Sequence, residues 1–161
     1  TQMKIHVNIS KQSLALFDDA GKLVRSYKVS TALHGPGEEA SSNCTPRGLH
    51  VIRAKIGEGQ PVNTVFVRRR PSGEVYTPEL GLQYPDRDWI LTRILWLSGC
   101  EPGYNRLGSC DTMRRYIYIH GTTVERGVGV PRSHGCINML NDDLLVLFDL
   151  VSVGTMVLIS A

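Results

Sequence analysis

Residues 116–121 read YIYIHG, and residues 133–138 read SHGCIN. In the first stretch the residue types alternate with the period of two that is typical of a β-strand. The alternation places Tyr116, Tyr118 and His120 on one face and two isoleucines on the other, where they would face a core. The stretch therefore predicts a strand over residues 115–120 that ends at a histidine.

A loop separates this strand from a cysteine. Residues 127–131 contain two glycines and a proline, and a loop of that composition can fold Cys136 back beside His120, sixteen residues earlier. A free cysteine, with a pKa of about 8.5, is a poor nucleophile at neutral pH because little of it is thiolate. A neighbouring imidazole can take the proton and stabilise the anion. The pair predicts a cysteine nucleophile with a histidine base, the arrangement of an acyl-transfer enzyme.

The residues beside the cysteine suggest two further roles. Gly135 leaves room for a substrate backbone, and its amide, with those of His134 and Cys136, could donate hydrogen bonds to an oxyanion. His134 is also a rival base, since two residues before Cys136 in an extended segment would place both side chains on one face. Substitution of each histidine in turn would separate His120 from His134.

These motifs resemble those of a known family, the L,D-transpeptidase catalytic domain, also called the YkuD domain. The active-site signature of that family is similar to residues 119–122 and 133–139. The resemblance extends over nearly the whole chain, through the weaker matches at residues 10–14, 21–24, 29–31 and 45–48.

The resemblance implies a role for each motif residue. Cys136 would be the nucleophile, His120 the base and the Gly121 carbonyl the group that orients His120. The amides of His134, Gly135 and Cys136 would form the oxyanion hole. The side chains that would shape the substrate site are those of Tyr118, Ser133, His134 and Asn138. Many members have arginine at the position of Asn138.

The resemblance also implies a reaction and its partners. In this family the cysteine attacks the carbonyl between a diamino acid and a terminal D-alanine in peptidoglycan tetrapeptide stems or muropeptides, and a thioester is left on the enzyme. Water then resolves the thioester in an L,D-carboxypeptidase, and an amine such as a D-amino acid resolves it in an L,D-transpeptidase. No cofactor is implied, and carbapenems would acylate Cys136. Two alternatives are a non-catalytic peptidoglycan-binding module and a metal-binding protein that uses cysteine and histidine.

Composition predicts one domain over residues 1–161. The chain has 42% hydrophobic and 20% charged residues, enough for a substantial core, and no apolar run long enough to span a membrane.

The net charge is +3, and no recognition motif accompanies it, so nucleic-acid binding is not expected. The consecutive arginines 68–70 indicate a solvated basic face, whereas Arg132 is the candidate for binding substrate carboxylates. The motif assigns no role to residues 68–115.

The coarse pattern predicts a mainly β fold with one or two short helices, in agreement with the β-sandwich or barrel that the resemblance implies. A hairpin loop is expected at residues 19–21, and helices over residues 142–151, with Asn141 as N-cap, and over residues 88–96. The remaining strand candidates are residues 3–9, 13–18, 23–30, 48–55, 63–67 and 155–160.

The other cysteines bear on the cellular compartment. Cys100 and Cys110 bracket a turn-rich segment and could form a disulfide in an exported protein, but are expected as free thiols in the cytoplasm. None of the cysteines has the paired spacing of a zinc site, so no metal is expected. A chain that begins at Thr1 without a secretory signal favours the cytoplasm, with the periplasm as the alternative for a trimmed chain.

Overall fold

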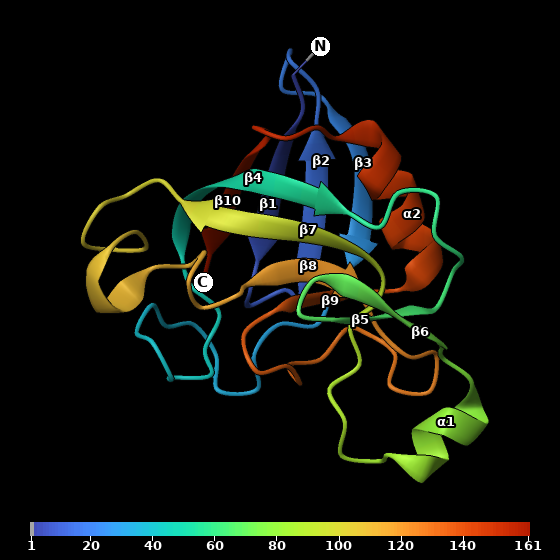
Figure 1. The fold of residues 1–161 in the computed structure, drawn as a ribbon. Coiled ribbons are helices and arrows are strands. Elements are labelled where there is room, and N and C mark those ends of the chain that lie inside the picture. The colour runs from blue at the N-terminus through green and yellow to red at the C-terminus, as the bar shows by residue number, and fades with distance from the viewer. Residues whose placement is uncertain (1) are drawn as a thin grey trace.

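The computed structural model describes residues 2–161, which form one curled sheet of ten strands with two α-helices (Figure 1). In chain order the elements are β1 (Lys4–Asn8), β2 (Ser13–Phe17), β3 (Leu23–Lys28), β4 (Gly48–Ile56), β5 (Thr64–Val67), β6 (Arg70–Val75), α1 (Pro78–Gln83), β7 (Leu91–Gly99), a 3₁₀ turn (Gly108–Cys110), β8 (Tyr118–Gly121), β9 (Ile137–Met139), α2 (Asn141–Leu150) and β10 (Met156–Ser160). The prediction of a mainly β fold is confirmed.

The strand order places the predicted motif strand beside the centre of the sheet. The order runs β3-β2-β1-β10-β4-β7-β5-β6, and β8 leaves this path by pairing with β7 and with β9. The pairs β1 with β10 and β8 with β9 are parallel, and the other pairs are antiparallel.

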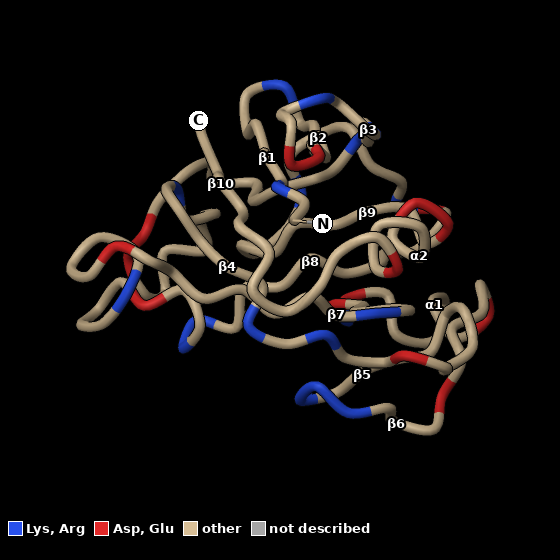
Figure 2. Tube along the Cα trace, turned by 90° about the horizontal axis from the view of Figure 1, so that it is seen from above, with Lys and Arg blue, Asp and Glu red and all other residues tan. Residues whose placement is uncertain are grey.

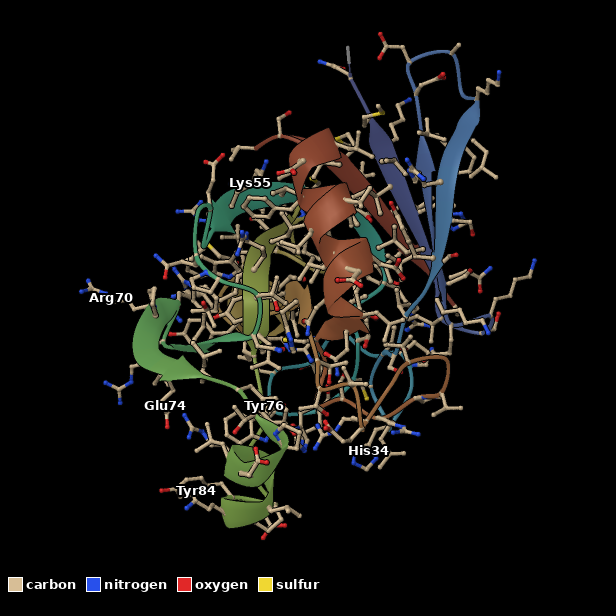
Figure 3. The ribbon with its side chains drawn as sticks, turned by 90° about the vertical axis from the view of Figure 1, so that its right-hand side faces the viewer. His34, Lys55, Arg70, Glu74, Tyr76 and Tyr84 are labelled. Atoms are coloured by element: carbon tan, nitrogen blue, oxygen red, sulfur yellow. The ribbon has the colours of Figure 1, made fainter. Side chains whose placement is uncertain are left out.

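The main core lies between the curled sheet and α2, which runs across it (Figure 3). Alternation supplies its strand residues, such as Ile5 and Val7 in β1, and Leu144, Leu147 and Phe148 supply the helix side. Burial of large apolar side chains is the dominant stabilising term in such a core, at about 1.5–3 kcal/mol for each one. The same core contains residues of β8 and β9, so the motif strands are part of the main buried cluster.

All seven predicted strands form, six of them with ends shifted by no more than two residues, and the hairpin loop at residues 19–21 joins β2 to β3. The strand predicted over residues 115–120 is wrong at its start. Arg115 and Tyr116 belong to a turn, with Tyr116 in the left-handed region at φ 57°, and β8 begins at Tyr118. The motif strand is therefore shorter than alternation alone indicated.

The helix predicted over residues 88–96 is wrong, because Leu91–Gly99 form β7. This strand pairs with β4, β5 and β8. Its first five residues are all buried, so both faces are covered and the sequence does not alternate. An apolar run of that kind does not distinguish a strand from a buried helix.

The helix predicted over residues 142–151 is confirmed as α2, but Asn141 is not its N-cap. Leu140 occupies the cap position, and Asn141 is the first helical residue. The Asn141 side chain instead donates to Asn63 Oδ1 at 2.8 Å and accepts from Thr92 Oγ1 at 2.7 Å. The short α1, which was not predicted, has Thr77 as N-cap.

Three further expectations concern the chain as a whole. The expectation of a cytoplasmic protein rested in part on Thr1, and this residue lies outside the described residues. In the described chain no helix combines the length and the apolar character needed to cross a bilayer. Cys100 and Cys110 are free thiols, so the structure contains no bridge between them.

His50 connects β4 to the turn that precedes β8. Its ring is fully buried, with Nδ1 3.0 Å from the Gly48 carbonyl and Nε2 3.0 Å from Thr112 Oγ1. Burial lowers the pKa of His50 from 6.5 to about 4, since a charged imidazole would lose its hydration there. The neutral ring therefore helps to hold residues 112–116 in place.

This burial predicts a pH-dependent stability. Between pH 6.5 and about 4 the unfolded chain binds a proton at His50 that the folded chain does not bind. The contribution of neutral His50 to the free energy of unfolding is therefore fully present above this pH range and is lost as the pH falls through it. His50 should contribute about 3 kcal/mol of that loss. Urea unfolding at several pH values should therefore show a shallower pH dependence for His50→Gln than for wild type. Parallel curves for the two proteins would contradict the assignment.

Candidate active site

The parallel pairing of β8 with β9 brings the predicted histidine and cysteine to one face. The register aligns Ile119 with Ile137 and His120 with Asn138. Aligned residues of two strands share a face, and faces alternate along each strand. The isoleucines therefore enter the main core, while Cys136, one residue before β9, lies on the same side as His120.

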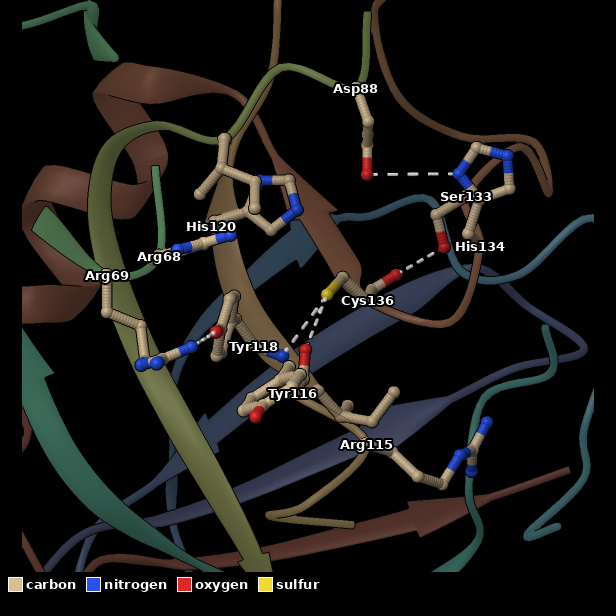
Figure 4. A pocket seen from close by; sticks show the side chains of 12 residues that line it. Arg68, Arg69, Asp88, Arg115, Tyr116, Tyr118, His120, Ser133, His134 and Cys136 are labelled. Carbon is tan, nitrogen blue, oxygen red and sulfur yellow. Dashed lines mark hydrogen bonds and ion pairs between the residues drawn. The ribbon is translucent and has the colours of Figure 1, made fainter. Parts of the chain in front are cut away.

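Both side chains line a cavity of about 410 Å³ (Figure 4). Its walls come from the turn between β5 and β6, from residues 88–90, from β8 with the turn before it, and from residues 133–136. Of the predicted substrate residues, Tyr118, Ser133 and His134 also line it. Segments far apart in the sequence thus meet around one sulfur atom.

The Cys136 sulfur is held by backbone groups of the β8 segment. The Tyr118 amide lies 3.3 Å from Sγ and the Tyr116 carbonyl 3.4 Å from it. The Tyr118 amide can donate to a thiolate, and the thiol can donate to the Tyr116 carbonyl. Both forms of the sulfur therefore have a partner at the base of the cavity.

A tight turn presents the cysteine. Ser133 Oγ donates to the Cys136 carbonyl at 2.5 Å and accepts from the Gly135 amide at 3.1 Å. Gly135 has φ 135°, and a Cβ there would lie 2.9 Å from Ile117 Cδ1, so the turn requires glycine. Because the Gly135 amide is already bonded to Ser133, it is not a free oxyanion donor in this structure. The amides of His134 and Cys136 are the candidates that remain.

His120 is buried, with 1% of its surface exposed, and its Nδ1 lies 2.7 Å from the Gly121 carbonyl. A carbonyl only accepts, so Nδ1 carries the proton of the neutral ring and Nε2 has a free lone pair. This is the tautomer that a general base needs.

Burial opposes charge on both groups. Desolvation raises the pKa of the Cys136 thiol to about 12, the Tyr118 amide and Arg115 lower it, and Asp88 raises it. Desolvation also lowers the pKa of His120, although Asp88 and the Gly121 carbonyl raise it. Both shifts favour the uncharged thiol and the uncharged imidazole, while the Cys136 side chain itself is only partly buried.

A strained bulge in β7 lies opposite the His120 end of β8. Thr92 has φ 76°, which is a genuine outlier for a β-branched residue, and the register shifts between Leu91 and Ile94, where β7 pairs with Gly121 and His120. Strain of this kind persists only where the surroundings hold it. Here the Thr92 hydroxyl donates to Asn141 Oδ1 at 2.7 Å.

The same polar network reaches Gly121. Thr92 Oγ1 accepts from the Asn63 amide at 3.1 Å, and a Cβ on Gly121 would lie 2.1 Å from Asn141 Oδ1 and 2.7 Å from the Leu91 carbonyl. Gly121 is thus enclosed between Asn141 and β7. The network fixes the peptide whose carbonyl orients His120.

Two predicted substrate residues lie away from the cavity. Asn138 is buried in β9, where its backbone pairs with Ser30 and its Oδ1 has no hydrogen-bond partner among residues 2–161. Arg132 lines a neighbouring cavity with Tyr76 and Trp89, and its guanidinium donates to the Arg126 carbonyl. The prediction that Arg132 supplies the arginine of the cysteine site is therefore not supported by its position.

Other charged residues lie at the cavity around Cys136. Arg68, Arg69, Asp88 and Arg115 line the cysteine cavity, and sequence reasoning assigned none of them to it. The arginine run directly follows the strand predicted over residues 63–67. A turn at the end of that strand was therefore the one sequence feature that could have indicated where the arginines lie. Figure 2 shows the run at the turn between β5 and β6.

His134 lies at the rim of the cavity, with 70% of its side chain exposed and Nδ1 3.8 Å from Asp88 Oδ2. Its exposure and its carboxylate neighbour set it apart from buried His120. The two histidines thus have different surroundings, and the choice of His120 over His134 as base stays a prediction.

The negative charge of Asp88 yields a test of the site's electrostatics. Asp88→Asn removes a charge that opposes the thiolate, so the pKa of Cys136 should fall and a larger fraction of the thiol should ionise at any pH below it. Alkylation of Cys136 by iodoacetamide at mildly alkaline pH, followed by mass spectrometry of its peptide, should accelerate about two- to tenfold.

Asp86→Asn is the matched control, because Asp86 is exposed in the same segment and does not line the cavity. It should leave the alkylation rate at the wild-type value. Equal rates for Asp88→Asn and Asp86→Asn would refute the electrostatic role of Asp88.

The bulge network yields a second test. Thr92→Val keeps the side-chain shape but leaves the Asn63 amide and Asn141 without the hydroxyl, which should lower the free energy of unfolding by about 1–3 kcal/mol. Because the Gly121 peptide is then less fixed, nitrogen NMR of the His120 ring should show a mixture of tautomers. Thr92→Ser should retain the wild-type free energy of unfolding and the single His120 tautomer. If Thr92→Val also behaves like wild type, the network does not fix the Gly121 peptide.

Known proteins resemble this chain in sequence. Residues 2–159 match the family described as YkuD, the L,D-transpeptidase catalytic domain. The chain is 34% identical over 122 residues to the probable L,D-transpeptidase YbiS of Escherichia coli K12, a match that covers 70% of this chain and 39% of that protein. It is 52% identical over 42 residues to the putative L,D-transpeptidase YqjB of Bacillus subtilis, covering 26% of this chain and 24% of the relative.

Solved structures show the same fold. An L,D-transpeptidase from Mycobacterium smegmatis superposes with a TM-score of 0.58 at 21% identity, covering 99% of this chain and 59% of the other. L,D-transpeptidase 3 from Mycobacterium tuberculosis, in complex with a faropenem-derived adduct, superposes with a TM-score of 0.59 at 15% identity, covering 99% and 60%. The chain spans about two-fifths of the length of YbiS. With a family match across residues 2–159, the chain belongs to the YkuD family of L,D-transpeptidase catalytic domains.

Proposed function

We propose that this protein is a cysteine acyltransferase that cleaves the bond between the diamino acid and the terminal D-alanine of peptidoglycan tetrapeptide stems. The observation that carries the proposal is Cys136 in a cavity beside a histidine whose Nδ1 is bonded to the Gly121 carbonyl. Membership of the YkuD family supports the same chemistry.

The first half-reaction begins from the neutral pair. As Sγ of Cys136 attacks the scissile carbonyl carbon, its proton passes to Nε2 of His120, so neither charge has to exist alone in the buried site. The amides of His134 and Cys136 are the donors that we assign to the oxygen that becomes negative. Asp88 and the Gly121 carbonyl stabilise the imidazolium that forms, since both favour the charged ring.

Collapse of the tetrahedral intermediate completes the step. The carbon–nitrogen bond breaks, the imidazolium returns its proton to the departing D-alanine amine, and the stem remains bound to Cys136 as a thioester. His120 is then neutral again and ready for a second acceptor.

In the second half-reaction His120 takes a proton from water or from an amine as either attacks the thioester. Water gives an L,D-carboxypeptidase and an amine, such as a D-amino acid, gives an L,D-transpeptidase. Both outcomes use the same residues, and the preferred acceptor and the compartment in which the enzyme acts stay predictions.

The two alternative functions lack a supporting feature. A non-catalytic peptidoglycan-binding module has no use for a thiol beside an oriented imidazole. A metal-binding protein needs a group of ligands, and residues 2–161 contain no cluster of three or more His, Cys, Asp or Glu side chains placed to hold an ion. The enzyme therefore accounts for more of the site.

Intact-protein mass spectrometry tests the proposal. Incubation with faropenem should add one covalent adduct to wild type and none to Cys136→Ala, because a β-lactam carbonyl acylates the same sulfur. Incubation with a purified tetrapeptide muropeptide should yield tripeptide, or exchanged product when a D-amino acid is present. An adduct that persists in Cys136→Ala, or an intact muropeptide after prolonged incubation, would count against the enzyme.

The same assay separates the two histidines. His120→Ala should slow acylation by about a hundredfold or more, since it removes the proton acceptor, whereas His134→Ala should change the rate by less than about tenfold. The reverse order would assign the base to His134.

A further inference from the structure

The cavity around Cys136 carries an excess of positive charge. Three arginines line it, Arg68, Arg69 and Arg115, against one carboxylate, Asp88. A cleft with walls of one charge concentrates ligands of the opposite charge. The cavity is therefore suited to a substrate that brings a carboxylate close to the reacting bond.

Two of these arginines are already occupied by the protein. Arg115 donates to the carbonyls of Gly37, Glu38 and Cys44 at 3.2, 3.2 and 2.6 Å and so holds the loop that packs on Gly135. This leaves the guanidinium of Arg115 few donors for a ligand.

Arg69 is equally engaged. Its guanidinium lies 4.9 Å from the ring centre of Trp96 and 4.7 Å from that of Tyr116, and Nη1 donates to the Tyr118 hydroxyl at 3.0 Å. Stacking and hydrogen bonding together hold the tip of the β5–β6 hairpin against β7 and β8. Arg69 acts as an anchor for the hairpin.

Arg68, next to the anchoring Arg69, is the lining arginine whose side chain has no partner within residues 2–161. It is the first residue of a two-residue turn, with Arg68 at φ 50° and Arg69 at φ 65°, both positive as in a type I′ hairpin turn. Arg68 is exposed, and within residues 2–161 its guanidinium has neither a hydrogen-bond partner nor a carboxylate within 4.0 Å. Figure 4 shows it at the His120 side of the cavity, across Cys136 from His134.

We infer that Arg68 binds the terminal carboxylate of the residue that leaves during acylation of Cys136, and so selects stems that end one residue after the scissile bond. A guanidinium pairs with a carboxylate through two parallel hydrogen bonds, which fixes orientation as well as charge. The inference rests on the proposed function and gives Arg68 the role that the sequence assigned to Arg132.

The selection follows from the fixed position of the hairpin. Because Arg69 anchors the turn, the backbone of Arg68 is held in place at the edge of the cavity. A stem whose last carboxylate is blocked leaves this arginine unpaired. A free carboxylate should therefore raise kcat/KM beyond what the rest of the stem supplies.

The experiment compares two donors, a tetrapeptide stem with a free C-terminal carboxylate and the same stem with a C-terminal carboxamide. For wild type, kcat/KM should be about ten- to a hundredfold higher for the free acid, the range expected of hydrogen bonds between charged groups. Arg68→Gln should lower the value for the free acid by the same factor and leave the carboxamide unchanged.

Arg70→Gln is the matched control, since Arg70 is exposed in the same arginine run and does not line the cavity. It should retain the wild-type preference, and Arg68→Lys should restore part of it. If Arg68→Gln lowers kcat/KM equally for the free-acid and the carboxamide donor, or lowers neither, the assignment of Arg68 is overturned.

The outcome also separates this inference from the proposed function. If wild type acylates Cys136 with both donors at equal rates, the carboxylate site is wrong and the enzyme stands. If wild type forms no adduct with either donor or with faropenem, the proposed function fails and the role of Arg68 fails with it.

Discussion

The parallel pairing of β8 with β9 is the interaction on which the candidate site depends. Both strands are short, and each buries one face in the main core. The other face of β8 carries Tyr118 and His120 to the cavity, and Cys136 directly precedes β9. The core face, through Ile119, Ile137 and Met139, makes the register stable, because a slip of one residue would move every side chain to the wrong face. Hydrophobic burial thus sets the geometry of the polar pair.

That placement determines the chemistry as well. Burial raises the pKa of Cys136 and lowers that of His120, so the site favours the uncharged form of each group. The backbone compensates for this, with the Tyr118 amide ready for a thiolate and the Gly121 carbonyl for an imidazolium. In the proposed reaction, charge is therefore separated as the sulfur attacks a substrate carbonyl.

The sequence predicted the parts of the structure that rest on local patterns. Alternation located most strands, an amphipathic stripe located α2, and the paired motifs identified Cys136 and His120 as the candidate pair. What it missed depends on tertiary contacts. The central strand β7 is buried on both faces and has no alternation, and Asn141 bonds to Thr92 and Asn63 rather than capping its helix. Likewise, only the hairpin between β5 and β6 brings Arg68 and Arg69 to the cysteine, while Arg132 lies at another cavity.

The most direct test of the neutral pair is the ultraviolet absorbance of the Cys136 thiolate as a function of pH. It is obtained as the difference between wild type and Cys136→Ala, so that the other three cysteines cancel. For a neutral pair, no thiolate signal is expected at neutral pH, and the absorbance should rise only in the strongly alkaline range, toward the pKa of about 12. A thiolate signal already present at neutral pH, and lost on mild acidification, would instead show a preformed thiolate–imidazolium pair.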